Sequence, residues 1–71
     1  MKLPRDLSGP EVVKALRSLG FSVVRQEGSH IRMAKNGLTT TVPNHRAIVP
    51  KTLQSILRHA RVSVEELMEN P

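Results

Sequence analysis

The chain has 71 residues, a net charge of +5, a single Phe, and no Trp, Tyr or Cys. A domain of this size buries only about 60% of the surface that its unfolded chain exposes, which leaves little room for a deep cofactor pocket. The lack of cysteine excludes a disulfide, a thiolate metal site and a thiol nucleophile. No segment is apolar enough to span a bilayer, and residues 1–7 lack the apolar run of a signal peptide. We expect one domain over residues 1–71 that acts at its surface in the cytoplasm.

The acidic residues are distributed unevenly along the chain. Residues 28–62 contain no Asp or Glu, whereas three of the six acidic residues lie within 65–71. The acid-free segment holds all three histidines and the cationic residues Arg32, Lys35, Arg46, Lys51, Arg58 and Arg61. Such a charge also serves solubility alone, but its segregation favours a polyanionic partner such as nucleic acid.

The first expected element is a helix that begins after Ser8. Ser8-Gly9-Pro10-Glu11 has the form of a capping box, with Ser8 at the N-cap and Glu11 three residues later. Gly20 has the position of the residue that ends the helix. Helical spacing predicts a buried stripe of Val12, Ala15, Leu16 and Leu19.

Three strands are expected next, over residues 21–26, 30–34 and 38–42, because these segments are rich in β-branched residues and are separated by turns. The Asn36-Gly37 pair is the stronger of the two turn signals. Successive hairpins make the sheet antiparallel. The apolar residues of the first strand cannot share one face without a bulge: Phe21, Val23 and Val24.

A second helix is expected to begin at Pro50 or Lys51, after a loop that is bounded by prolines. Its buried stripe consists of Leu53, Ile56, Leu57 and Ala60. Another capping box, Ser63-Val64-Glu65-Glu66, predicts a short third helix over residues 64–69. The predicted fold is α+β, with the order α-β-β-β-α and helices on one face of a three-stranded antiparallel sheet.

Alternation along the strands assigns side chains to the two faces of this sheet. Ile31 and Met33 should face the helices, which places His30 and Arg32 on the open face. The third strand adds hydroxyl groups to that face from Thr39 and Thr41.

His30 is the candidate catalytic residue, because it begins a strand directly after Gly28-Ser29 and is held by the ladder yet open to solvent. An imidazole can accept or donate a proton near neutral pH. His30 could remove the 2′-hydroxyl proton of RNA, while Arg32 or a lysine stabilises the charge on the phosphate. A strand-edge polar residue without a catalytic role is the alternative.

No metal or other cofactor is expected. The acid-free segment lacks the carboxylates that hold Mg²⁺, and the histidines lack the close spacing of a zinc site.

A second candidate site is a ridge formed by Lys51, Ser55 and Arg58, which fall at i, i+4 and i+7 opposite the apolar stripe of the second helix. This ridge could bind RNA phosphates together with the N-terminal amides of the helix. It could equally be an ordinary solvated helix face.

Five motifs recur together in one known family. They are Ser8-Gly9, Leu19-Gly20-Phe21, and the segments from Arg25 to His30, from Thr41 to His45 and from Pro50 to Arg58. In their order and spacing they resemble the HicA toxin family of bacterial and archaeal toxin–antitoxin pairs, over residues 8–67.

This resemblance implies a fold like the double-stranded-RNA-binding domain and an mRNA interferase that needs neither metal nor ribosome. It also implies a HicB-type antitoxin as partner. The catalytic residue would be the histidine of the Gly-Ser-His motif, which is His30. Many members have a second histidine at the position of Ile31. His45 matches another histidine common in the family, and we favour a structural role for it in its loop.

Two other functions stay open. A non-catalytic RNA-binding module would use the same basic surface, although the single aromatic residue, Phe21, should be buried and unable to stack on bases. A protein-interaction adaptor would instead dock an acidic partner there. A neighbouring gene for an antitoxin-like protein would favour the toxin.

Overall fold

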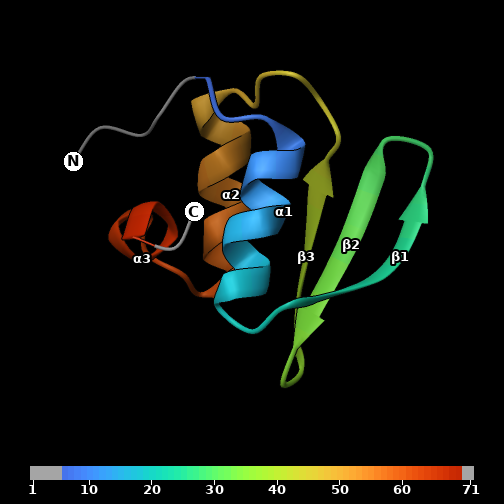
Figure 1. Ribbon diagram of the computed structural model, residues 1–71, viewed down its shortest axis with the longest axis vertical. Coiled ribbons are helices and arrows are strands. Elements are labelled where there is room, and N and C mark those ends of the chain that lie inside the picture. Colours follow the sequence, from blue (N-terminus) through green and yellow to red (C-terminus); the bar gives the residue numbers. More distant parts are fainter. Residues whose placement is uncertain (1–5, 70–71) are drawn as a thin grey trace.

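In the computed structural model, which describes residues 6–69, a three-stranded antiparallel sheet lies against a layer of helices (Figure 1). The elements are α1 (Gly9–Ser18), β1 (Ser22–Glu27), β2 (His30–Lys35), β3 (Leu38–Pro43), α2 (Pro50–Ala60) and α3 (Val64–Glu69). The strand order is β1-β2-β3. This arrangement confirms the predicted α+β fold, which is like the double-stranded-RNA-binding domain. Expectations for residues 1–5, 70 and 71, which include the start of the segment inspected for a signal peptide, lie outside the described residues.

α1 begins with the predicted capping box. The backbone N–H of Ser8 donates to Glu11 Oε1 at 2.9 Å, and the backbone N–H of Glu11 donates to Ser8 Oγ at 3.2 Å. The hydrogen bond from the Ser8 backbone, followed by that with its side chain, lowers the pKa of the Glu11 carboxyl group. The carboxylate therefore stabilises the fold above its unfolded-state pKa, and that contribution is lost as the pH falls through the lowered value.

A lysine from the sheet forms a hydrogen bond with the C-terminal end of α1. Lys35 Nζ donates a hydrogen bond to the Leu19 carbonyl oxygen at 2.6 Å and lies 5.9 Å from the centroid of the Phe21 ring. Gly20 allows the chain to turn there with a φ of +102°. One cation of the acid-free segment therefore joins α1 to β2.

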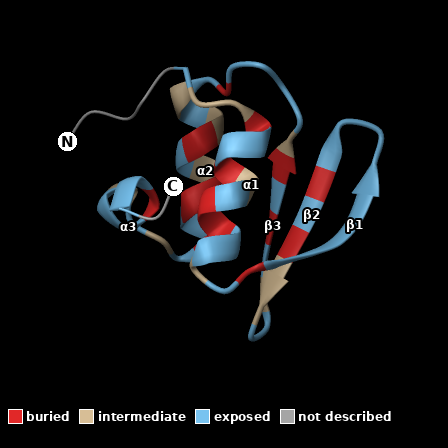
Figure 2. Ribbon diagram, viewed as in Figure 1, coloured by how far each residue is buried: buried red, intermediate tan, exposed pale blue. Residues whose placement is uncertain are grey.

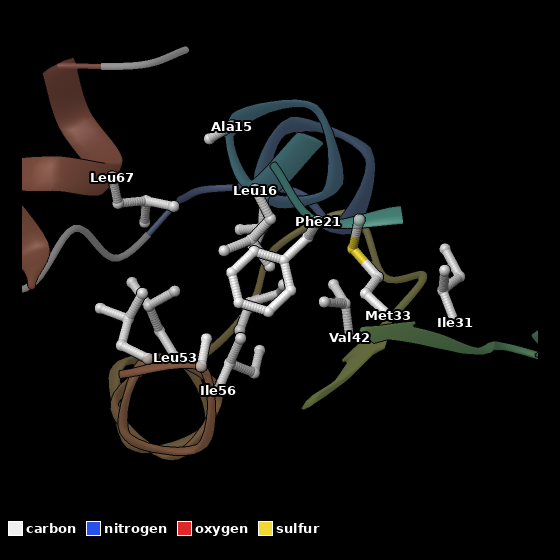
Figure 3. Packing of buried hydrophobic residues seen from close by; sticks show 13 residues of the cluster. Ala15, Leu16, Phe21, Ile31, Met33, Val42, Leu53, Ile56 and Leu67 are labelled. Carbon is white, nitrogen blue, oxygen red and sulfur yellow. The ribbon is translucent and has the colours of Figure 1, made fainter. Parts of the chain in front are cut away.

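The apolar side chains form one core between the helices and the sheet (Figures 2 and 3). In Figure 3 the Phe21 ring lies between α1 and α2, near Leu16 and Ile56. The predicted stripes of both helices are buried, except that Leu19 is only partly buried. The buried Thr40 hydroxyl donates to the Ile56 carbonyl oxygen at 3.0 Å and so attaches β3 to α2.

The helices do not cover β1. All six of its residues are exposed, and the strand is pale blue along its length in Figure 2. The register shifts directly after Val23, which leaves Val24 without a cross-strand partner at an irregularity of the strand, and its side chain is 60% exposed. On β1, Val23 and Gln26 pair with the two inward-facing residues of β2 and so lie on the same face of the sheet. Only one of these two β1 residues is apolar, so a helix placed over β1 would bury little apolar surface.

Candidate active site

The open face of the sheet carries the side chains that alternation predicts. Ile31 and Met33 are buried, whereas His30 and Arg32 are exposed. The ladder pairs Arg32 with Thr41 of β3 on one side and with Arg25 of β1 on the other. Cationic and hydroxyl groups are therefore neighbours on this face.

His30 follows a two-residue turn and begins β2. Gly28 has a φ of +57°, and no heavy atom lies within 4 Å of the place where a Cβ would be, so glycine is needed there for its backbone conformation alone. The hairpin pairs His30 with Glu27. Residues directly opposite in antiparallel strands have Cβ atoms about 4.5–5.5 Å apart. A carboxylate is therefore the cross-strand neighbour of the candidate catalytic residue.

This carboxylate also forms an ion pair on its own strand. Arg25 Nη2 donates to Glu27 Oε2 at 3.0 Å, and the two side chains are 60% and 70% exposed. An ion pair this exposed contributes about 1 kcal/mol or less, so Glu27 can exchange Arg25 for another partner at little cost. Glu27 was not among the predicted site residues.

Backbone hydrogen bonds fix the loop that follows β3. They are Asn44 N–H to the Ser29 carbonyl at 2.6 Å, Gly9 N–H to the His45 carbonyl at 2.8 Å, and Ile48 N–H to the Leu7 carbonyl at 2.7 Å. The first bond extends the β2–β3 pairing by one residue beyond His30 and Pro43. The loop therefore has a defined position beside the start of β2 and the start of α1.

A shallow groove of about 330 Å³ lies between this loop, the sheet and α2. Its polar side chains are His30, Thr41, His45 and Thr52. His30 comes from the start of β2 and His45 from the loop, so the fold brings together two exposed imidazoles that are far apart in sequence. Their proximity was not predicted from the sequence.

The N-terminus of α2 borders the groove through Val49 and Thr52. The N-cap residue is Val49, whose side chain has no hydrogen-bond acceptor, and the first turn of α2 contains no acidic residue. Pro50, the first residue of α2, has no N–H, and the Leu53 N–H bonds to the Val49 carbonyl. The amides of the two residues between them lack partners within the helix and carry a partial positive charge, so this end favours an anion beside the groove.

The ridge predicted on α2 lies outside the groove. Lys51 and Arg58 are exposed and Ser55 is half-buried, on the side of the helix opposite its buried stripe. Among residues 6–69, the groove includes Thr52 from α2 and none of these three side chains. The ridge and the groove meet at the first turn of α2, where Lys51 precedes Thr52.

Much of the negative charge lies far from this site. α3 carries Glu65, Glu66 and Glu69 and lies on the side of the helical layer away from the sheet (Figure 1). Within residues 6–69, no three His, Asp or Glu side chains lie where they could hold a metal ion. None of the helices described for these residues is long and apolar enough to cross a membrane.

The order α-β-β-β-α around a three-stranded antiparallel sheet defines the class as a fold like the double-stranded-RNA-binding domain. The family model for the HicA toxin of bacterial toxin–antitoxin systems matches residues 9–62, from the first residue of α1 to just beyond α2. The chain therefore belongs to the HicA toxin family, and its role is that of a toxin with an antitoxin partner. The match includes every residue of the groove and the ridge. A comparison with curated proteins finds no match.

Proposed function

We propose that this toxin is a metal-independent endoribonuclease that cleaves mRNA in the cytoplasm, with His30 as a catalytic residue, and that a HicB-type antitoxin neutralises it. The observation that carries the proposal is the position of His30. Its imidazole is exposed at the first residue of β2, in a groove that the N-terminus of α2 borders. Membership of the HicA family supports a toxic activity at this site.

RNA can be cleaved by its own 2′-hydroxyl group, and this reaction needs few protein groups. A base removes the 2′-hydroxyl proton, the 2′-oxygen attacks the adjacent phosphorus, and an acid protonates the leaving 5′-oxygen. His30 acts as the base. Arg32, two residues further on the same face of β2, and the N-terminus of α2 stabilise the charge that develops on the phosphate. Because the nucleophile belongs to the substrate, no metal-bound water is required.

The ridge of Lys51, Ser55 and Arg58 extends the surface for RNA along α2. Lys51 and Arg58 are exposed, and Lys51 stands beside the groove at the first turn of the helix. A strand whose cleavable phosphate lies at His30 continues past this turn and places its next phosphates on the ridge. Contacts of this kind position RNA without selecting its sequence.

The test compares His30→Ala and His30→Gln with His59→Ala. His59 is an exposed histidine of α2 outside the groove, so it controls for the loss of an imidazole as such. General acid–base groups contribute about 10²–10⁴-fold to a rate, and we expect a loss of this size for the two His30 variants only. All three should keep the circular dichroism spectrum of the wild type, because an exposed side chain leaves no cavity in the core.

The cleaved RNA identifies the reaction. A substrate with a single 2′-deoxynucleotide at the cleavage position should resist the wild-type protein, because it lacks the attacking hydroxyl group. A folded His30 variant that cleaves RNA at the wild-type rate would refute the assignment of the base. A wild-type protein that binds RNA and leaves it intact would instead identify a non-catalytic RNA-binding module.

A further inference from the structure

Two histidines form walls of the same groove. His30 enters it from the start of β2, and His45 enters it from the loop after β3. The backbones that carry them are held in register, because the Asn44 N–H donates to the Ser29 carbonyl oxygen at 2.6 Å. Ser29 and Asn44, which directly precede the two histidines, are thus joined by a single hydrogen bond, and this bond fixes how far apart the two chain segments lie.

The fold does not require the side chain of His45. The carbonyl oxygen of His45 accepts a hydrogen bond from the Gly9 N–H at 2.8 Å, and any residue at this position would supply that carbonyl. The side chain itself is exposed. The structural role expected for this residue therefore belongs to its backbone and leaves the imidazole available for chemistry in the groove.

We propose that His45 is a second catalytic residue, the general acid that protonates the leaving 5′-oxygen of the RNA. The inference rests on the proposed endoribonuclease function, which by itself leaves the acid unassigned. An in-line displacement at phosphorus places the entering and leaving oxygens on opposite sides of the phosphate. A base on β2 and an acid on the facing loop supply one group for each side, and the N-terminus of α2 lies beside both.

The protons and bonds balance in this scheme. Neutral His30 takes the 2′-hydroxyl proton as the bond between the 2′-oxygen and phosphorus forms. The bond between phosphorus and the 5′-oxygen breaks, and the imidazolium of His45 gives its proton to that oxygen. The products are a 2′,3′-cyclic phosphate and a 5′-hydroxyl end. His30 is then protonated and His45 neutral, and exchange with water restores both.

The experiment uses two RNA substrates of one sequence that differ at a single atom. One has the natural 5′-oxygen at the cleavage position, and the other has a bridging 5′-sulfur, which leaves as a thiolate without needing a proton. His45→Ala should cut the oxygen substrate about 10²–10⁴-fold more slowly than the wild type, which is the usual contribution of a general acid. On the sulfur substrate its rate should return to within a few-fold of the wild-type rate.

Two variants complete the comparison. His30→Ala should be slow on both substrates, because the 2′-hydroxyl proton must be removed in either case. His59→Ala should match the wild type on both, since its side chain lies outside the groove. His45→Gln should reproduce His45→Ala, which guards against a defect specific to the smaller residue.

Three outcomes would overturn the inference. His45→Ala could cut natural RNA at the wild-type rate, or it could lose activity equally on both substrates, which would indicate a binding or positioning role. If either of these two results is found while His30→Ala is inactive, the proposed endoribonuclease function stands and only the role of His45 fails. If the wild type cuts neither substrate, the proposed function itself fails and the inference fails with it.

Discussion

Replacing Gly9 with alanine tests how closely α1 packs against the end of β3 and the loop that carries His45. Gly9 is buried, and a Cβ there would collide with the Pro43 carbonyl oxygen and lie 2.8 Å from the Asn44 Cα. Both of these atoms belong to the backbone, so no flexible side chain can move aside. Gly9→Ala must separate α1 from the loop or distort one of them.

The cost can be worked out from three contributions. Forcing an extra carbon into a packed site costs about 1–3 kcal/mol. The hydrogen bond from the Gly9 N–H to the His45 carbonyl, 2.8 Å long, would be weakened, at a further cost of about 0.5–1.5 kcal/mol. The higher helix propensity of alanine offsets up to about 1 kcal/mol. Together these ranges give a net loss of about 0.5–4.5 kcal/mol, centred on about 2.5 kcal/mol, and the central value lowers the Tm of a domain this size by roughly 10–20 °C.

The assay is thermal and urea unfolding of Gly9→Ala beside the wild type and Gly37→Asn. Gly37 lies in the β2–β3 turn with a φ of +84°, and no heavy atom lies within 4 Å of the place where a Cβ would be. Asparagine is one of the few residues other than glycine that adopt this region of backbone conformation, so this control adds a side chain without a collision and should lower the free energy of unfolding less than Gly9→Ala does. A Gly9→Ala protein as stable as the wild type would refute the close packing of α1 on the loop.

Three other predictions concern the site itself. RNA cleavage should persist in EDTA and leave 2′,3′-cyclic phosphate or 3′-phosphate ends, and a loss of cleavage that Mg²⁺ restores would contradict the mechanism. The double variant Lys51→Ala with Arg58→Ala should weaken RNA binding across sequences. The slope of log K against the logarithm of the salt concentration should become shallower by about 0.7 per lost phosphate contact, whereas an unchanged slope would mean an ordinary solvated helix face. In the antitoxin complex, His30 and Arg32 should be covered by an acidic surface, so modification of His30 by diethyl pyrocarbonate, followed by peptide mass spectrometry, should slow sharply. Equal reactivity in a non-toxic complex would place inhibition at a distance.

The elements of the fold could be predicted because their signals are local. The capping box at Ser8 and the glycine after α1 each depend on residues within a few positions of one another. The same holds for the orientation of His30 and Arg32, which follows from strict alternation once Ile31 is assigned to the core. Short-range rules were therefore sufficient to place the candidate base on the open face.

The composition of the groove was missed because it depends on register. The strands predicted over 21–26, 30–34 and 38–42 leave three residues for each turn, whereas in the structure both hairpins turn over two residues. A two-residue turn at Asn36-Gly37 pairs Lys35 with Leu38, and counting back along the ladder then pairs His30 with Pro43. The signal that would have brought His45 beside His30 was therefore present in the sequence.

Other features could not be obtained by counting. The hydrogen bond from Gly9 to His45 and the approach of α2 to the groove depend on how α1, the loop and the core pack together in three dimensions. The exposure of β1 depends in the same way on how far the two long helices reach across the sheet (Figure 2). These are consequences of the whole fold, and no local pattern of residues encodes them.

A domain this small places its site on the surface, and this has a consequence for how its residues respond to mutation. His30, His45 and Arg32 are all exposed, so their side chains contribute little to the core. Their positions are set instead by backbone groups, through the β2–β3 ladder and the hydrogen bond from Gly9. Changes at the site residues should therefore remove activity and leave stability intact, whereas a change at Gly9 should reduce both together. This difference separates the groups that do the chemistry from the backbone contacts that hold them in place.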